Sequence, residues 1–171
     1  MGLTTGLLIF GLYQPILTAP IGRVALAIAL LHTASTWFMV GLIWVIQRVH
    51  YPSMHYIEPD RFAPFEKYHC DAIGSIVAPC MLLEAVSSAA LALHCNGPWQ
   101  WAVLIAGWGL LAILWGSTFW IQVPLHARLQ LGKNPDTIDR LVRTNWIRTV
   151  AWSIRGALAV WMLVLMLLPS P

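Results

Sequence analysis

Four apolar segments, each long enough to cross a bilayer, constrain the fold of this 171-residue chain. They occupy residues 24–46, 72–93, 99–123 and 149–168. A helix needs about 20 apolar residues to span the hydrocarbon core. Only helices and closed barrels satisfy every backbone hydrogen bond in lipid, and these segments lack the apolar-polar alternation of barrel strands. The sequence therefore predicts an all-α, integral membrane four-helix bundle that forms one domain over residues 1–171.

Composition and the N-terminal segment fit the same class. Hydrophobic residues make up 58% of the chain and charged residues only 10%, too few to cover a water-soluble surface. Residues 3–19 are apolar, but Gly6, Gly11 and Pro15 interrupt them. We expect a short interfacial or re-entrant segment that stays in the mature protein, because the basic start and cleavage site of a signal peptide are missing.

Basic residues predict the orientation. With four spans, residues 47–71 and 124–148 are expected to form two long loops on the same side. They hold most of the Lys and Arg residues, namely Arg48, Arg61, Lys67, Arg128, Lys133, Arg140, Arg143 and Arg148. By the positive-inside rule these loops are cytoplasmic and both termini face outward. We expect a bacterial inner-membrane protein, and nothing in the charge pattern indicates a nucleic-acid surface.

Polar residues from all four helices reach one level near the expected cytoplasmic boundary. Glu66 and His69 form a Glu-x-x-His pair on one helix face. At a rise of about 1.5 Å per residue, His50, His126 and Asn145 fall at the same depth. Imidazole and carboxylate groups suit iron, copper, zinc or manganese, and the two together favour iron. Helical bundles hold metals with inward-facing side chains, including Glu-x-x-His pairs.

The sequence therefore predicts a metal site whose ligands are His50, Glu66, His69 and His126. His55 is expected to fold back as a spare ligand or acid-base group. Asn145 and Arg148 are expected to orient the substrate or a metal-bound oxygen species. The bland alternative is that each histidine only lies at the headgroup level and hydrogen-bonds a loop carbonyl.

A second polar group lies deeper in the expected membrane. An unpaired charge there is costly, so Glu84 is expected to face the interior and to contact Arg155 or His32. Two roles stay open for this group: an ion pair that locks the helices, or a proton or substrate path toward the histidines. Haem between His32 and His94 is an alternative cofactor, although the depths of the two residues differ.

Short motifs in the second half of the chain carry a family resemblance. They read Gln122-Val123-Pro124-Leu125-His126, Arg140-Leu141-Val142 and Asn145-Trp146-Ile147-Arg148-Thr149, with Val49-His50-Tyr51-Pro52 in the first half. This pattern resembles the anthrone-oxygenase-like family of small four-helix membrane proteins. The resemblance implies oxygenation of a fused-ring anthrone to a quinone, with His126, Asn145, Trp146 and Arg148 as the matching residues. The extra histidines His50, His55 and His69 point to a metal-using branch of the same architecture.

Our hypothesis is a membrane oxidoreductase, oxygenase-like, with a transition metal, iron or copper, and a hydrophobic small-molecule substrate that enters between helices from the lipid bilayer. The alternative is a non-catalytic accessory or scaffold subunit, whose helices pack in a homo-oligomer or a larger membrane complex. Three cysteines, Cys70, Cys80 and Cys95, indicate no disulfide framework.

Overall fold

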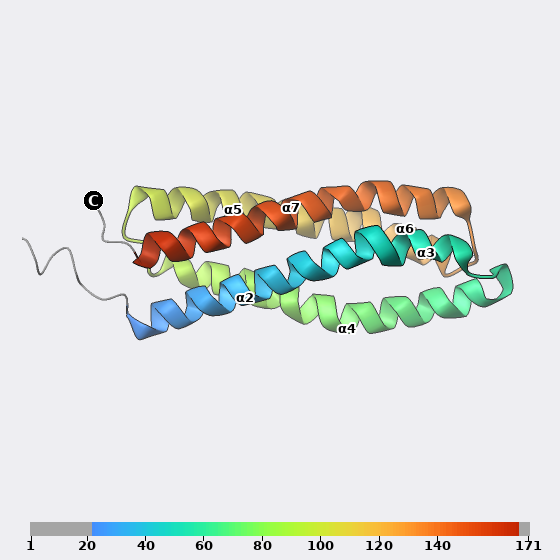
Figure 1. Cartoon of the computed structure of the whole chain (residues 1–171), viewed down its shortest axis with the longest axis horizontal. Coiled ribbons are helices and arrows are strands. Elements are labelled where there is room, and N and C mark those ends of the chain that lie inside the picture. The colour runs from blue at the N-terminus through green and yellow to red at the C-terminus, as the bar shows by residue number, and fades with distance from the viewer. Residues whose placement is uncertain (1–21, 168–171) are drawn as a thin grey trace, which may run out of the picture.

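Four helical rods make up the computed structural model, which describes residues 22–167 (Figure 1). The first two rods are α2 (Arg23–Val45) continued by the π-helical turn η1 (Ile46–His50), α3 (Tyr51–Ser53) and the 3-10 turn η2 (Met54–Tyr56), and then α4 (Pro59–Ala92). The last two are α5 (Pro98–Ser117) continued by the π-helical turn η3 (Thr118–Gln122) and α6 (Val123–Leu129), and then α7 (Pro135–Leu167). The described residues contain no strand, which confirms the predicted all-α four-helix bundle. The expected segment 3–19 and residue 168 of the fourth span lie outside them.

The prediction of two long loops at 47–71 and 124–148 is wrong. Both segments are almost entirely helical, and the turns that remain on that side cover only 57–58 and 130–134. Hydropathy marks the part of a helix that lipid can surround, whereas the helix itself continues as long as its backbone hydrogen bonds do. Pro59 and Pro135 mark the starts of the next helices, because a proline in the first turn needs no backbone N–H.

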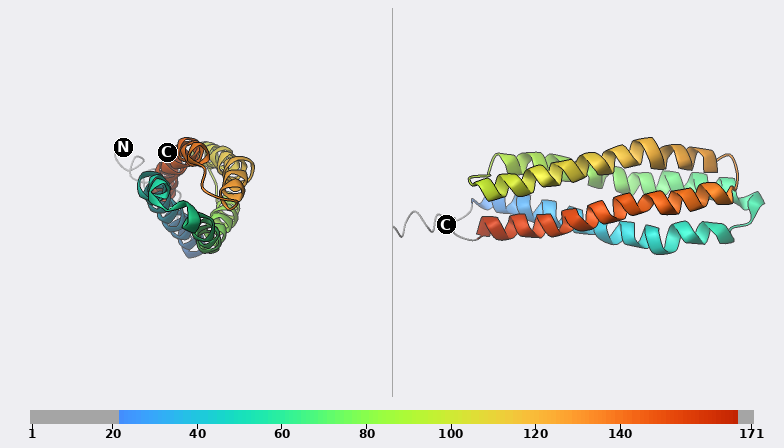
Figure 2. Two further views of the ribbon diagram at one scale, coloured as in Figure 1. Left: turned by 90° about the vertical axis from the view of Figure 1, so that its right-hand side faces the viewer. Right: turned by 90° about the horizontal axis from the view of Figure 1, so that it is seen from above.

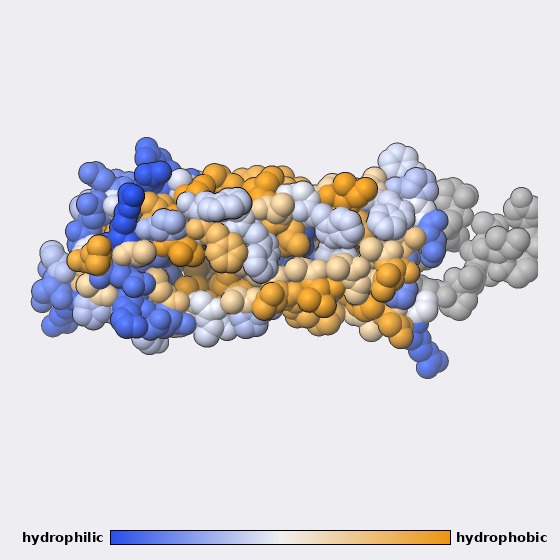
Figure 3. All heavy atoms as spheres, turned by 180° about the vertical axis from the view of Figure 1, so that it is seen from behind, coloured by the Kyte–Doolittle hydropathy of each residue, from blue (hydrophilic) through white to orange (hydrophobic). Residues whose placement is uncertain are grey.

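The rods are longer than a bilayer core is thick. They contain 32 to 34 residues, and each includes a stretch apolar enough to cross a membrane. At about 1.5 Å per residue this is about 50 Å, against about 30 Å for the hydrocarbon core. Hydrophilic residues gather at the end that carries the turns 57–58 and 130–134 (Figure 3). The rods therefore continue past the apolar region at this end.

Polarity is distributed as expected for a protein in lipid. Large apolar side chains cover the outside, and Trp120 and Trp161, for example, are 82% and 54% exposed. Charged and polar side chains lie inside, where Glu66, Glu84 and Asn145 have no exposed surface at all. Water would reverse this arrangement, because it leaves ionised groups outside and apolar groups inside. The bundle therefore suits a membrane environment.

Rods that follow one another in the chain lie side by side, and α7 closes the ring by packing against α2 (Figure 2). The packing is closest between α2 and α7, between α5 and α7, and between α2 and α4. By contrast, α4 meets α5 and α6 over a much smaller contact. The side of the bundle between α4 and α5–α6 is therefore its most loosely packed seam.

The two π-helical turns have a common local cause. Each ends two residues before a proline, since η1 precedes Pro52 and η3 precedes Pro124. Proline lacks a backbone N–H, and its ring clashes with the carbonyl four residues earlier. A widened turn relieves that clash without breaking the helix, and such π-bulges are frequent at functional sites. The two wide turns carry the buried side chains of Gln47 and Gln122.

Two glycines offer a test of the packing between α2 and α7. A Cβ at Gly156 would lie 3.1 Å from the Val40 side chain and 3.4 Å from Trp37, whereas a Cβ at exposed Gly109 would meet nothing within 4 Å. Gly156→Val is expected to destabilise the bundle by about 1–3 kcal/mol through overpacking. Gly109→Ala is expected to stabilise it by up to about 1 kcal/mol through helix propensity. Thermal unfolding in detergent measures the change in stability of both variants. A change of the same sign in both would contradict the close contact of Gly156 with Val40 and Trp37.

Candidate functional site

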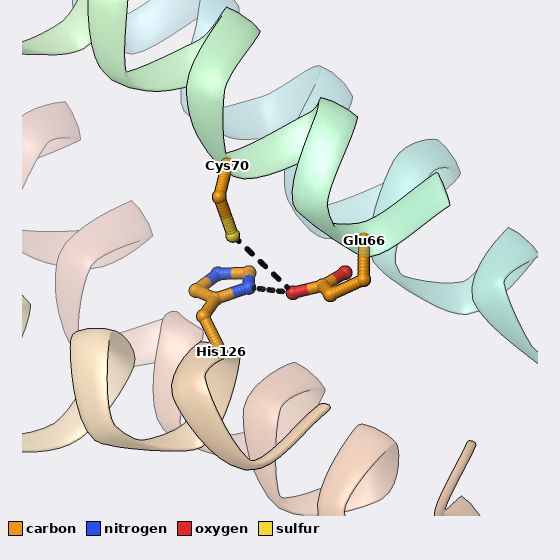
Figure 4. Close-up of side chains that lie close together, drawn as sticks. All are labelled: Glu66, Cys70 and His126. Atoms are coloured by element: carbon orange, nitrogen blue, oxygen red, sulfur yellow. Dashed lines mark hydrogen bonds and ion pairs between the residues drawn. The ribbon is translucent and has the colours of Figure 1, made fainter. Parts of the chain in front are cut away.

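A carboxylate, a thiol and an imidazole meet at the polar end of the bundle. Glu66 and Cys70 lie one turn apart on α4, and His126 approaches from α6 (Figure 4). His126 Nδ1 lies 2.5 Å from Glu66 Oε1, and the Cys70 thiol donates to the same oxygen over 3.5 Å. These three side chains form the one group of His, Cys, Asp and Glu residues, within the described part of the chain, whose ligand atoms all lie within 4.8 Å of one another.

The hydrogen-bond chain continues from His126 to the first rod. Its other nitrogen, Nε2, lies 2.9 Å from the hydroxyl of Tyr51, which is buried. A carboxylate only accepts, so the network assigns a proton on Nδ1 that is donated to Glu66 and makes the Tyr51 hydroxyl the donor to Nε2. Tyr51, His126 and Glu66 thus form a continuous chain of two hydrogen bonds across three rods.

His50 and His69 lie beside this chain. The centroids of their rings are 4.2 Å apart, and the ring of His69 is 5.4 Å from that of His126. Three atoms in this region are buried and have no hydrogen-bond partner among residues 22–167, namely His50 Nε2, His69 Nε2 and Glu66 Oε2. The four residues of the predicted ligand set, His50, Glu66, His69 and His126, therefore lie in one region, but neither His50 nor His69 belongs to the group whose ligand atoms lie within 4.8 Å of one another.

Two members of the cluster were missed by the sequence analysis. Cys70 lies four residues after Glu66, so the i, i+4 spacing that places both on one face was available as a signal. Tyr51 directly follows His50, but successive residues on a regular helix point in different directions. No sequence signal indicated that its hydroxyl would reach His126.

The structure does not bring His55 into the cluster. Its Nε2 pairs with Asp139 Oδ1 at 2.9 Å, and 35% of its side chain is exposed. Lys133 donates to the backbone carbonyls of His55 and Ile57 over 2.8 and 2.7 Å. The expectation that His55 folds back is wrong because residues 51–56 continue the helical rod instead of forming a loop. His55 fastens the turn at 57–58 to α7.

A hydrogen-bonded clamp holds Asn145 and Arg148 next to the cluster. Gln47 Oε1 accepts from Asn145 Nδ2 at 2.9 Å and from the Thr149 hydroxyl at 3.3 Å. Arg148 Nη1 donates to Asn145 Oδ1 at 3.3 Å, and its guanidinium lies 5.2 Å from the ring centroid of Trp152. Arg148 is only 6% exposed. The hydrogen bond to Asn145 thereby fixes the direction of the guanidinium, and the Trp152 ring covers one of its faces.

Two apolar cavities flank the cluster. One, of about 260 Å³, is lined by Cys70, His126 and Arg148 together with apolar side chains such as Met39 and Val77. The other, of about 240 Å³, reaches His50 and His69, and Leu42, Ile46 and Ile73 line both cavities. Both volumes far exceed the roughly 10–15 Å³ that one water molecule requires. The polar cluster thus lies between two spaces large enough for apolar molecules.

The deeper charged group consists of Glu84 and Arg155. Arg155 Nη2 lies 3.7 Å from Glu84 Oε1, and Trp152 Nε1 donates to Glu84 Oε2 over 3.0 Å. Of the two partners expected for Glu84, the structure places Arg155 on it, whereas His32 pairs with the Ser87 hydroxyl at 2.9 Å. Arg155 also donates to the Gly107 carbonyl over 2.5 Å. These contacts do not test the haem alternative with His94.

Comparison with known proteins finds no family model that matches the chain, and no significant similarity to a curated protein or to a solved structure. The resemblance to the anthrone-oxygenase-like family therefore stays a prediction.

Proposed function

We propose that the protein is a membrane-embedded, metal-dependent oxidoreductase, oxygenase-like, that acts on a lipid-soluble substrate. One observation carries the proposal. Three buried atoms that could bind a metal, His50 Nε2, His69 Nε2 and Glu66 Oε2, have no hydrogen-bond partner within the described part of the chain, and their cluster borders two apolar cavities. A buried polar atom without a partner costs about 1–3 kcal/mol, so several in one place call for a ligand. A metal ion supplies what these lone pairs lack.

The donor set fits a transition metal. Glu66, His69 and His50 provide the carboxylate and imidazole ligands that iron and copper accept, and Cys70 lies close enough to Glu66 to add a sulfur. His126 can add a further imidazole only if its Nε2 gives up the hydrogen bond with Tyr51. Iron or copper supplies one-electron redox chemistry and a place for dioxygen to react. The hydrogen bond from His126 to Glu66 Oε1 leaves Oε2 free, so this contact orients the carboxylate as outer hydrogen bonds do at metal sites.

The remaining residues of the site prepare the substrate. The wall of the larger cavity is mainly apolar, and the loosely packed seam between α4 and α5–α6 offers a route from lipid. Tyr51 and His126 hold a proton at the edge of this cavity and can pass it along their hydrogen bonds. Asn145, fixed by Gln47, directs Arg148 toward the substrate.

In this proposal the charge pattern sets the cellular location and orientation of the protein. The site lies at the basic end of the bundle, which the positive-inside rule assigns to the cytoplasm of a bacterium, with both termini outside. The accessory-subunit alternative gains no specific support, because exposed tryptophans such as Trp120 and Trp161 are accounted for by lipid.

Metal analysis of the wild-type protein tests the proposal. Protein purified in nonionic detergent is expected to retain about one or more transition-metal ions per chain, because the ligands are buried and slow to exchange. Elemental mass spectrometry measures the ratio of metal to protein, and a chelator-treated sample gives the background. A ratio near that background, after reconstitution with iron and copper as well, would contradict the proposed function.

A further inference from the structure

One buried cation beside the larger cavity has no counter-charge among the residues that the structure describes. Arg148 is 6% exposed, yet no Asp or Glu oxygen among residues 22–167 lies within 4 Å of its guanidinium. Its guanidinium meets only neutral groups, the amide of Asn145 and the hydroxyl of Tyr51, and its Nε has no partner in that part of the chain. The Trp152 ring offers a cation–π contact, which is weaker than an ion pair and covers only one face.

Arg155, the other buried arginine of α7, has the carboxylate partner that Arg148 lacks among the described residues. Arg155, at 2% exposed, lies on the same helix and has the carboxylate of Glu84 at 3.7 Å and the carbonyl of Gly107 at 2.5 Å. A buried charge needs a partner of opposite sign, and arginine stays protonated even when buried. Among residues 22–167, a carboxylate pairs with Arg155 and none pairs with Arg148. The two sites also differ in the size of the adjoining space, because Arg148 and His126 line the cavity of about 260 Å³, whereas the pocket beside Arg155 measures only about 20 Å³.

We infer that the larger cavity binds a lipid-soluble molecule that carries an oxyanion head group, a carboxylate or its equivalent, and that Arg148 pairs with this group. The cavity measures about 260 Å³ and its wall is mainly apolar, with Met39, Ile43 and Val77 among the lining residues. An apolar body therefore fits beside a charged head. The planar guanidinium matches two oxygens of one head group, and Gln47 and Asn145 already hold its direction. The inference rests on the proposed function only in treating this molecule as the substrate, because the binding itself requires no metal.

A fluorescent fatty acid and its neutral counterpart test the charge requirement. Chelator-treated protein in nonionic detergent is titrated with cis-parinaric acid and with the corresponding alcohol, and quenching of tryptophan fluorescence reports binding. We expect the acid to bind at least about tenfold more tightly than the alcohol, as expected for a charge-assisted hydrogen bond. The preference should persist at high salt, because a buried pair is screened little. Equal affinities in the wild-type protein would overturn the inference, as would no binding of either probe.

Variants assign the preference to Arg148. In Arg148→Gln the acid is expected to bind no better than the alcohol, whose affinity stays unchanged. Arg143→Gln is the matched control, because Arg143 is exposed on the same helix and does not line the cavity. A preference that survives in Arg148→Gln would remove Arg148 from the site. If that variant does not fold, Arg148→Lys keeps the charge but loses the planar guanidinium, and it is expected to weaken the preference for the acid several-fold. The comparison of acid and alcohol in the wild-type protein needs no variant.

A comparison of two lipids distinguishes the two possible sources of the oxyanion, a free carboxylic acid and an anionic lipid. The acid titration is repeated in nanodiscs of phosphatidylglycerol and of phosphatidylcholine. Weaker binding of the acid in phosphatidylglycerol alone would show that the anionic lipid competes for Arg148, and would identify its phosphate as the head group. Acid binding that is equal in both lipids would identify a free carboxylic acid. The two proposals can fail separately. If the wild-type protein binds no metal but still prefers the acid to the alcohol, the proposed function is refuted and the inference stands.

Discussion

His69→Ala is expected to lower the metal content of the purified protein at least about tenfold while the bundle stays folded. His69 Nε2 is buried and finds no hydrogen-bond partner in the described range 22–167, and the centroid of its ring lies 4.2 Å from that of His50 and 5.4 Å from that of His126. Loss of an outer hydrogen-bond partner at a metal site already costs about 10–100-fold in affinity, and loss of a ligand should cost no less. Elemental mass spectrometry gives the metal ratio, and circular dichroism and gel filtration show whether the helices and the particle size persist.

His94→Ala provides the matched control for this result. It removes the same imidazole from the turn at 93–97, at the opposite end of the bundle from the cluster. Its metal content should equal that of the wild type. A His69→Ala protein with unchanged stoichiometry would exclude His69 as a ligand.

Glu84→Gln is expected to destabilise the bundle by about 3 kcal/mol, because it leaves Arg155 buried without its carboxylate. The two side chains are 0% and 2% exposed, and Glu84 also accepts from Trp152 over 3.0 Å. Metal content should stay at the wild-type level, since the pair belongs to the deeper network. Unfolding in mixed detergent micelles measures the free-energy change.

A double-mutant cycle with Arg155→Gln separates the roles left open for Glu84. If the pair is a lock between α4 and α7, the double variant loses less stability than the two single variants added together. Wild-type stability in Glu84→Gln would show instead that the carboxyl is neutral and merely hydrogen-bonded. Stability and metal that both survive, with a fall in turnover once a substrate is in hand, would assign Glu84 to a proton path.

The pattern of apolar and polar residues accounts for most of the predicted architecture. Four apolar segments predicted the four helices, because length and hydropathy alone decide which segments can cross a bilayer. The Glu-x-x-His spacing placed Glu66 and His69 on one stripe of α4, and depth alone matched His50 and His126 to their level. The cost of an isolated charge predicted a partner for Glu84 from a neighbouring helix. These are properties of single helices and of the lipid around them, so they can be read from the sequence.

Contacts between helices were decided by the tertiary structure alone. The rotation and register of each rod select Arg155 over His32 for Glu84, bring the Tyr51 hydroxyl to His126, and place the Cys70 thiol on Glu66. The helical continuation through residues 51–56 turns His55 toward Asp139 instead of toward the cluster. A cavity is likewise the space that several rods leave unfilled, so the isolation of Arg148 became visible only once the rods were packed. Sequence spacing defines which face of a helix a residue occupies, but the packing of the other three helices defines what that face meets.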